Sequence, residues 1–334
     1  MNSIFRNAIP TILLGYLATA GFLVSSPATA QLDGPRVYWP LPKNTNIVTG
    51  HLIEGTANAS WSNWSRIEPD VDIDSSLYLL GYTRVQPILG RTVYWQGLLP
   101  SGTVRTSSLL PEPTSDTFAS GIGDLSVGAT VNLFGAPEMM AKDWVRHELD
   151  WSVNLGLMVS APTGQYDPEE TLNIGSNQWK TRISAPIVKS FGEWVPGKRT
   201  TLEIMPAVTL LGDNDSAQGN RIEQDPLYSI EMHLTRDITE NAYISLDYTW
   251  LDGGEETYTD LATGSFVRES GGISSDLLGV TLQYNINDNM RLFMTHMQAL
   301  DSDSDSLSLD GSITKITLSW SWHDVLERVQ RFKD

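Results

Sequence analysis

The chain has 334 residues and carries 22 Lys and Arg against 40 Asp and Glu, a formal net charge of −18. This acidic balance argues against a nucleic-acid partner, because phosphate neutralisation requires clustered cations. The sequence contains no cysteine, which excludes a disulfide scaffold, a Cys-ligated metal site and a thiol nucleophile. Only 40% of the residues are hydrophobic, yet 11 Trp and 27 Gly are present, which fits a β-barrel with a polar lumen better than a bundle of membrane helices.

The first 30 residues have the features of an export signal. Arg6 is their only formal side-chain charge, an apolar segment runs over about 9–24, and residues 28–30 are Ala-Thr-Ala. A small-x-small end is typical of a signal-peptidase site and places the mature start at Gln31. The alternative is an uncleaved membrane anchor, for which the apolar segment is short beside the roughly 20 residues that a span requires. We therefore predict that residues 1–30 are a cleaved signal peptide.

Residues 31–44 precede the first predicted strand and contain Tyr38, Trp39 and several prolines. Two arrangements are open for this segment. It enters the barrel lumen from below as a plug, or it forms a loose periplasmic arm.

Alternation of apolar and polar residues, the signature of a strand with one apolar face, runs along most of the mature chain. In residues 151–160, Trp, Val, Leu, Leu and Val alternate with Ser, Asn, Gly, Met and Ser, and 241–250 repeats the pattern. Such segments are about ten residues long, which matches a tilted bilayer span rather than a typical strand of five or six. The pattern predicts twelve strands, near 46–60, 73–86, 91–103, 122–134, 148–160, 178–191, 200–211, 227–237, 241–251, 274–286, 289–299 and 312–322.

The connections between these segments alternate in length. Those after even-numbered segments are mostly short, such as Asp237 to Glu240, whereas those after odd-numbered segments have about ten residues or more. Short turns on one rim and long loops on the other are typical of bacterial outer-membrane barrels. We therefore predict an all-β fold, a single up-and-down antiparallel transmembrane β-barrel over residues 45–322, with a short periplasmic tail at 323–334. A soluble sandwich with one apolar sheet face is the alternative.

If the apolar set of each strand faces lipid, the opposite set faces the lumen. Charged side chains in lipid near the midplane cost roughly 2–4 kcal/mol, so an inward orientation is strongly favoured for them. Two roles are open: mutual pairing that braces the wall, and a polar path for solutes. The lumen-facing candidates are Asp124, Lys180, Arg182, Glu203, Glu231, His233, Asp247 and Arg291.

Several blocks of sequence carry a family resemblance. They are Gly123-Asp124-Leu125, Pro162-Thr163-Gly164-Gln165-Tyr166-Asp167, residues 172–179, Gln224-Asp225-Pro226-Leu227-Tyr228-Ser229 and Ser245-Leu246-Asp247-Tyr248. In this order and spacing, the blocks resemble the outer-membrane transporter family named for the MetA pathway of phenol degradation, over most of residues 44–322. The resemblance implies an outer-membrane channel linked to aromatic degradation. Two features depart from the family pattern: Gln178 stands where the pattern has Arg, and the tail follows the last aromatic strand, which ends at Trp322.

Parts of these blocks lie where predicted strands meet long loops. Pro and Gly set turn geometry at such places, so a purely structural role competes with a gate for solutes. The loop and gate candidates are Pro162, Thr163, Gly164, Tyr166, Asp167, Asn173, Asn177, Gln224, Asp225 and Pro226.

The long loops are acidic, as in the run Asp301-Ser302-Asp303-Ser304-Asp305-Ser306. Oxygen ligands at alternate positions suit calcium, but the run lacks the Gly turn and distal Glu of an EF-hand, so a solvated loop is favoured and no metal site is predicted. The five histidines lie in neither a Gly-x-Ser-x-Gly nor a His-Glu-x-x-His motif. We expect no catalytic residue, no cofactor and no enzymatic activity. A hydrolase on the barrel rim is the competing enzyme hypothesis.

These patterns predict an outer-membrane channel for passive uptake of small hydrophobic or aromatic compounds, with the solute class coming from the resemblance alone. A non-transporting structural or surface-binding barrel is the alternative. The expected partners are the small-molecule solute, outer-membrane lipid, lipopolysaccharide and the barrel-assembly machinery.

Overall fold

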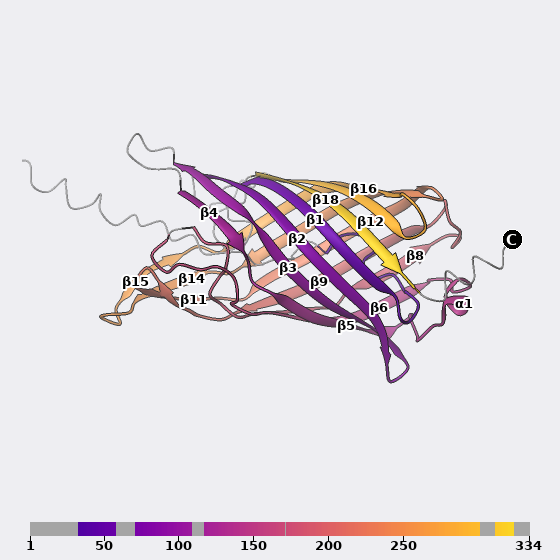
Figure 1. Ribbon diagram of the computed structural model, residues 1–334, viewed down its shortest axis with the longest axis horizontal. Helices are drawn as coiled ribbons and strands as arrows, with labels where there is room; N and C mark the ends of the chain where they lie inside the picture. The colour runs from indigo at the N-terminus through magenta and orange to yellow at the C-terminus, as the bar shows by residue number, and fades with distance from the viewer. Residues whose placement is uncertain (1–32, 58–70, 109–116, 171, 301–310, 324–334) are drawn as a thin grey trace, which may run out of the picture.

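The computed structural model describes residues 33–57, 71–108, 117–170, 172–300 and 311–323, and its strands form an antiparallel barrel (Figure 1). The first strand, β1 (Asn46–Ala57), pairs along its whole length with the last, β18 (Gly311–Trp322), so the sheet closes on itself. Closure satisfies the backbone without water, which a lipid environment demands. Of the described residues, none forms a helix long and apolar enough to cross a bilayer.

The wall has twelve strand positions, and the predicted barrel is therefore confirmed. Two positions consist of two shorter strands each, because the chain leaves the ladder at 123–125 and at Ala185-Pro186, where proline lacks an N–H. Between β1 and β18 the wall strands are β2 (Val71–Ile88), β3 (Arg91–Ser108), β4 (Thr117–Ile122) with β5 (Ser126–Phe134), β6 (Trp151–Ser160), β7 (Lys180–Ser184) with β8 (Ile187–Phe191), β9 (Thr200–Leu211), β12 (Leu227–Thr239), β13 (Ala242–Gly253), β16 (Ile273–Asn285) and β17 (Met290–Ala299).

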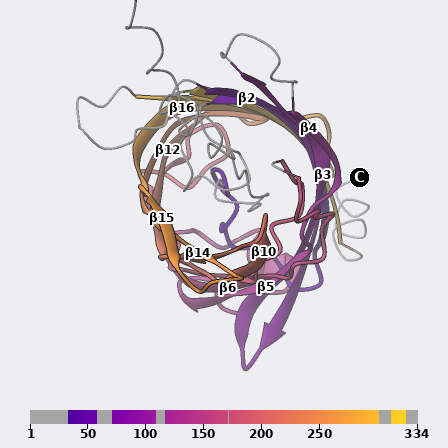
Figure 2. The ribbon, with the colours of Figure 1, turned by 90° about the vertical axis from the view of Figure 1, so that its left-hand side faces the viewer.

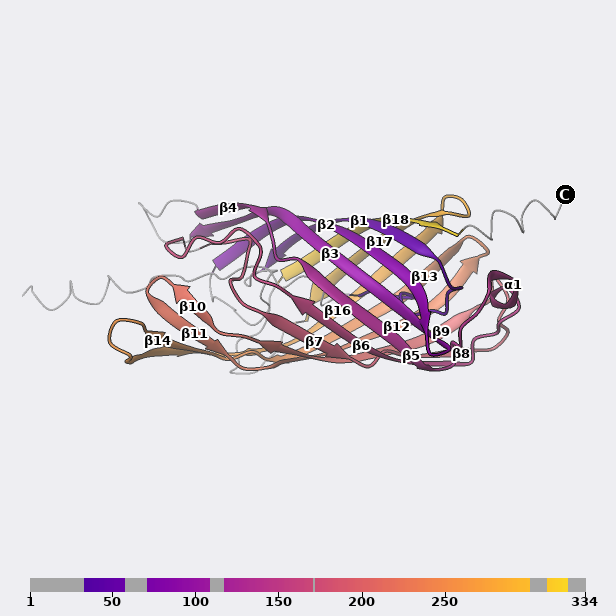
Figure 3. The same ribbon diagram turned by 60° about the horizontal axis from the view of Figure 1, so that its bottom comes forward.

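The two ends of the barrel differ, and we call them the short-turn end and the long-loop end (Figures 1 and 3). The short-turn end carries the one-turn helix α1 (Ala141–Trp144). At the long-loop end a separate antiparallel sheet extends past the wall, formed by β10 (Asn214–Ala217), β11 (Asn220–Gln224), β14 (Glu256–Asp260) and β15 (Phe266–Ser270). The alternation did not predict this sheet, because strands of four or five residues are too short to show a period.

The outward positions of the wall are apolar and exposed. Leu157, Leu246 and Trp320 each expose 51% of their surface. Their inward neighbours along the strand are polar and buried, such as Ser245 and Asp247 beside Leu246. An apolar exterior over a polar interior is the reverse of a soluble sheet and suits a barrel in lipid.

The interior is not polar along its whole length, which differs from the predicted lumen. Toward the long-loop end, the inward positions hold an apolar cluster. The period-two pattern hid it, because inward Leu277 is followed by outward Leu278 and the two read as one apolar run. We call this group the apolar layer: Ile53, Ile73, Leu77, Val104, Leu172, Ile174, Leu227, Leu251, Ile273, Leu277, Met297, Ala299 and Ile313.

Candidate functional site: the barrel interior

The N-terminal arm, residues 33–45, lies inside the barrel (Figure 2). Two wall carboxylates that are fully buried bind its backbone. The N–H of Asp33 donates to Glu231 Oε2 at 3.0 Å, and the N–H of Arg36 donates to Glu203 Oε2 at 2.9 Å. A buried carboxylate requires such donors, because removing it from water without them is costly. These contacts tie the arm to β9 and β12.

Arg182 on β7 joins the arm to the wall. Its Nη1 lies 3.0 Å from Asp33 Oδ2 and its Nη2 lies 3.5 Å from Glu231 Oε1. The Tyr38 hydroxyl also donates to Asp33 Oδ2, at 2.8 Å. A buried cation is stable only when it is paired and hydrogen-bonded, so Arg182 depends on the arm as well as on the wall.

The side chain of Arg36 forms a second set of contacts, nearer the short-turn end. Its Nη1 lies 2.6 Å from Asp237 Oδ1, and its Nε donates to Thr235 Oγ1 at 2.9 Å. The guanidinium carbon lies 3.8 Å from the ring centre of Tyr243 and 4.2 Å from that of Trp39. Arg36 has a φ of 64°, a left-handed conformation that costs a side chain roughly 1–2 kcal/mol. The surrounding contacts hold it there.

Trp39 anchors the part of the arm that approaches the rim. Its Nε1 donates to Glu203 Oε1 at 3.0 Å, and its ring lies 4.8 Å from that of Trp194. Its carbonyl accepts from the Tyr94 hydroxyl at 3.0 Å. Beyond it, Trp144 of α1 donates to Pro40 O at 2.7 Å. The arm is therefore fixed from mid-barrel to the short-turn rim.

A histidine and an aspartate extend the charged group around the wall. His233 Nδ1 lies 2.7 Å from Asp247 Oδ1, and His233 Nε2 lies 3.7 Å from Glu231 Oε2. Asp247 also accepts from the hydroxyls of Ser245 and Thr281, each at 2.5 Å. A continuous charged layer therefore crosses β7, β9, β12 and β13, on the short-turn side of the apolar layer.

The structure brings together five of the eight lumen-facing candidates in this charged layer. They are Arg182, Glu203, Glu231, His233 and Asp247. Of the other three, Lys180 is buried on β7 and Arg291 is exposed on β17, while Asp124 belongs to the loop described next. Asp33 and Arg36 were not among the predicted residues, although their charges in a segment otherwise rich in Pro and aromatics were a usable signal.

The loop between β6 and β7 folds over β4 and is held by Asp124. This carboxylate is fully buried and accepts from the N–H groups of Gly164 and Ser176, each at 2.9 Å. The Ser176 hydroxyl donates to it at 2.5 Å. Hydrogen bonds to a charged acceptor contribute roughly 1.5–3 kcal/mol each, so Asp124 is the main tie of this loop. It is not part of the charged layer.

The loop also covers an edge of the wall. β4 pairs with β3 on one side only, whereas on the other side Gln165 exchanges hydrogen bonds with Ile122: Gln165 N–H donates to the Ile122 carbonyl and Ile122 N–H donates to Gln165 Oε1. The Leu125 N–H donates to Thr163 Oγ1 at 3.0 Å. Further along, Leu172 and Ile174 of the loop enter the apolar layer. One loop therefore seals the wall edge and lines the interior.

Most of the gate candidates meet around this loop. Asp167 N–H donates to Asn173 Oδ1 at 2.7 Å, which closes a small turn. Asn214 of β10 donates to the Tyr166 hydroxyl and accepts from Asn177 Nδ2, at 2.9 and 2.8 Å. Partial burial raises the pKa of Tyr166, which keeps its hydroxyl protonated as a donor to Ser216 O. Pro162 leads into the same loop.

Gln224, Asp225 and Pro226 form a separate group at the junction of β11 and β12. The Asp225 N–H donates to Glu255 O at 2.8 Å, and Gln224 Nε2 donates to Gly254 O at 3.2 Å. These hydrogen bonds fix the β13–β14 connection. The acidic run 301–306 lies outside the described residues.

Known structures share this architecture. The COG4313 outer membrane channel from Pseudomonas putida F1 matches with a TM-score of 0.69 and 21% identity over 86% of this chain and 99% of that one. The Pseudomonas putida toluene transporter TodX gives a TM-score of 0.44 and 11% identity over 90% of this chain and 94% of that one. The transport unit of the autotransporter AIDA-I from Escherichia coli gives a TM-score of 0.48 and 8% identity over 86% of this chain and 92% of that one.

None of the curated proteins matches the chain. A family model does match, over residues 54–308, which span the barrel from β1 to beyond β17. The resemblance inferred from the sequence blocks is confirmed, and the chain belongs to the family described as "Putative MetA-pathway of phenol degradation".

Proposed function

We propose that the protein is an outer-membrane channel for the passive uptake of small hydrophobic or aromatic compounds. The apolar layer carries this proposal. A general water-filled pore has a polar lining, whereas here the inward positions toward the long-loop end are Ile, Leu, Val and Met. Apolar surface removed from water contributes roughly 25 cal/mol per Å², so this lining favours apolar solutes over sugars. The family description, phenol degradation, supports the same solute class.

The orientation follows from the connections. Short turns of outer-membrane barrels face the periplasm and long loops face outward, so the apolar layer is the outer half and the charged layer the inner half. The order of charge, apolar segment and small residues in 1–30 supports a cleaved signal peptide. The apolar exterior of the wall supports an outer-membrane location.

Two parts of the protein stand between the mouths of the channel. The 161–179 loop contributes Leu172 and Ile174 to the apolar layer, and the arm occupies the charged layer through Asp33 and Arg36. An apolar solute gains no favourable interaction energy from the ions of the charged layer. It therefore passes the inner half only when the arm moves. We therefore assign the arm as a plug and the 161–179 loop as the outer gate.

Solute uptake into liposomes tests this function. The mature protein is refolded into vesicles, its folding is checked by heat-shifted gel mobility, and entry of an ionised aromatic acid is compared with entry of a sugar of similar size. Faster aromatic entry than in empty vesicles, with little sugar entry, is the expected result. Equal entry of both would mean a general pore, and no entry of either into vesicles with folded barrel would favour the non-transporting barrel.

A further inference from the structure

The β2–β3 hairpin continues past its neighbours at the short-turn end. β1 begins opposite Arg84, and the pairing of β3 with β5 ends at Val93, whereas β2 and β3 pair out to Ile88 and Arg91. Figures 1 and 2 show this hairpin leaning away from the barrel, to the outside of the wall. The space beside a transmembrane barrel is lipid, so the tip points into the leaflet at this end.

The residue at the tip is unusual for a turn in water. Leu89 and Gly90 have φ of 51° and 76°, which is the pattern of a type I′ turn, where Asn-Gly or Asp-Gly is preferred. A leucine there costs roughly 1–2 kcal/mol in backbone strain and exposes 97% of its surface. Neither fact favours folding. An apolar environment around Leu89 accounts for its high exposure, because the side chain would then not face water.

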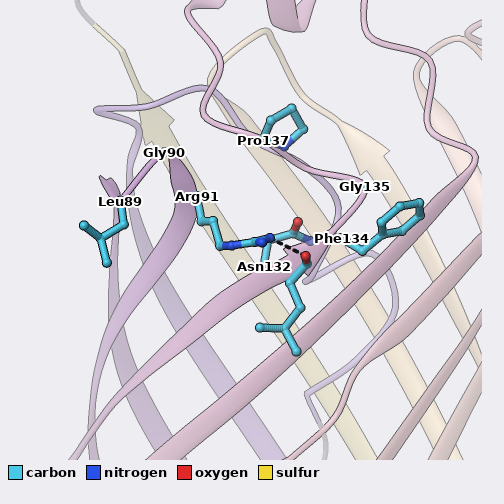
Figure 4. Close-up of a pocket in the computed structure, with 8 residues that line it drawn as sticks. Leu89, Gly90, Arg91, Asn132, Phe134, Gly135 and Pro137 are labelled. Atoms are coloured by element: carbon cyan, nitrogen blue, oxygen red, sulfur yellow. Dashed lines mark hydrogen bonds between the residues drawn. The ribbon is translucent and has the colours of Figure 1, made fainter.

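The tip is held in place by the adjoining turn between β5 and α1. The Glu138 N–H donates to Gly90 O at 3.2 Å, and Thr92 Oγ1 donates to Pro137 O at 3.1 Å. The Arg91 guanidinium donates to Leu133 O (Figure 4). All three contacts come from the end of β5 and the turn that follows it. Leu89 is therefore presented in a fixed position.

A pocket of about 380 Å³ opens between the hairpin and this turn (Figure 4). Among the described residues that line it, Arg91 is the only charged one, in a chain with a net charge of −18. The acid next to the lining, Glu138, is paired with Lys43 at 2.5 Å. The lining residues are Leu89, Gly90, Arg91, Asn132, Leu133, Phe134, Gly135 and Pro137.

We propose that this pocket binds an anionic phospholipid of the periplasmic leaflet. Phe134 and Leu89 contact the acyl chains, and Arg91 binds the phosphate. Arg91 uses one of its five N–H donors on Leu133 O, which leaves others for phosphate oxygens. Leu133 and Phe134 of the lining are 44% and 63% exposed. On the neighbouring strands β3 and β6, Trp95 and Trp151 are each 44% exposed, as in an interfacial belt. The site is independent of which solute the barrel carries.

The depth of Leu89 in the membrane is the first test. The chain has no cysteine, so Leu89→Cys gives a single site for an environment-sensitive fluorophore. The labelled protein is refolded into vesicles of phosphatidylethanolamine and phosphatidylglycerol that contain lipids brominated on the acyl chain. We expect strong quenching at position 89 and little at the matched control Asp288→Cys, in the β16–β17 turn. Equal quenching at the two positions, or none at 89, would overturn the proposal.

The headgroup contact is tested separately by lipid retention. Phosphatidylglycerol bound to the detergent-solubilised barrel is measured by native mass spectrometry for the wild type, Arg91→Ala and the control Lys142→Ala. One cation near an anionic headgroup contributes enough for about fivefold weaker binding in Arg91→Ala. Lys142→Ala, on the exposed face of α1, should retain wild-type binding. Equal loss in both variants, or displacement of the lipid by millimolar inorganic phosphate, would contradict a specific lipid site at Arg91.

Discussion

Arg36 Nη1 lies 2.6 Å from Asp237 Oδ1, and this pair joins the N-terminal arm to the short-turn end of β12. The two side chains are 10% and 6% exposed, so the pair is shielded from water. Asp237 also accepts from the N–H groups of Gly197 and Arg199, at 3.1 and 3.2 Å. The carboxylate therefore keeps partners if Arg36 leaves, whereas the arm loses its ion pair with β12.

Arg36→Met should release the arm while the wall persists. Breaking a buried pair costs roughly 3–5 kcal/mol, which exceeds the contribution of an exposed pair. The measurement is the rate of maleimide labelling of Pro35→Cys, a buried position of the arm, in the otherwise cysteine-free chain. Labelling should accelerate at least tenfold with Arg36→Met. Lys43→Met, which removes the exposed pair with Glu138, is the matched control and should leave the rate nearly unchanged. Identical rates in all three proteins would show that the pair does not hold the arm.

Asp124→Asn should loosen the 161–179 loop. The amide oxygen can still accept a hydrogen bond, but the charge that strengthens the bonds from Gly164 and Ser176 is gone, a loss of roughly 1.5–3 kcal/mol. Limited proteolysis of the folded barrel measures this loosening as faster cleavage within the loop. Glu170→Gln, an exposed carboxylate of the same loop, is the control. Cleavage as slow as in the wild type would argue that Asp124 is not the main tie.

Leu246→Arg tests which face of β13 meets lipid. Leu246 lies near the middle of the strand and is 51% exposed, so an arginine there should cost roughly 2–4 kcal/mol in a bilayer. Tyr228→Arg, at the long-loop end of β12 and 49% exposed, should cost only about 0–1 kcal/mol, because the interface is near. Denaturant unfolding in vesicles gives both values. Equal costs at the two depths would contradict the assigned membrane span.

Gly135→Ala should disturb the turn after β5. Gly135 has a φ of 87°, and an added Cβ would lie 1.6 Å from the Trp151 carbonyl oxygen. Gly90→Ala has the same backbone problem at a φ of 76° but meets open space. We expect Gly135→Ala to lower the yield of heat-shifted, folded barrel well below that of Gly90→Ala. If the two variants fold alike, the close approach at Gly135 is not a constraint.

The alternation of residues was enough to predict the twelve wall positions, because one face of each strand meets lipid over its whole span. In 151–160 and 241–250 the pattern is uninterrupted, and both strands are where it placed them. The break at 123–125 depends on loop contacts, which the alternation does not report, whereas the break at Ala185-Pro186 follows from the proline.

The interior was harder to predict than the wall. Glu203, Glu231 and Asp247 were predicted to face the lumen, because a charged side chain that faces lipid is destabilising. The apolar layer was not predicted, because an inward Leu251 or Leu277 looks the same in sequence as an outward one. The partners of the carboxylates were also hidden, since Asp33 and Arg36 come from a segment with no periodic pattern at all.

If apolar solutes pass along the apolar layer, polar substitutions in that layer should change the ratio of aromatic-acid to sugar uptake in liposomes. Leu251→Asn and Leu277→Asn place a polar group of similar size in that layer, and Gln96→Asn changes an inward position of β3 outside it. Each variant is first shown to be folded by its heat-shifted gel mobility. We predict that the two leucine variants lower the uptake ratio severalfold and that Gln96→Asn leaves it at the wild-type value. An unchanged ratio in the leucine variants would contradict the passage of apolar solutes along the apolar layer.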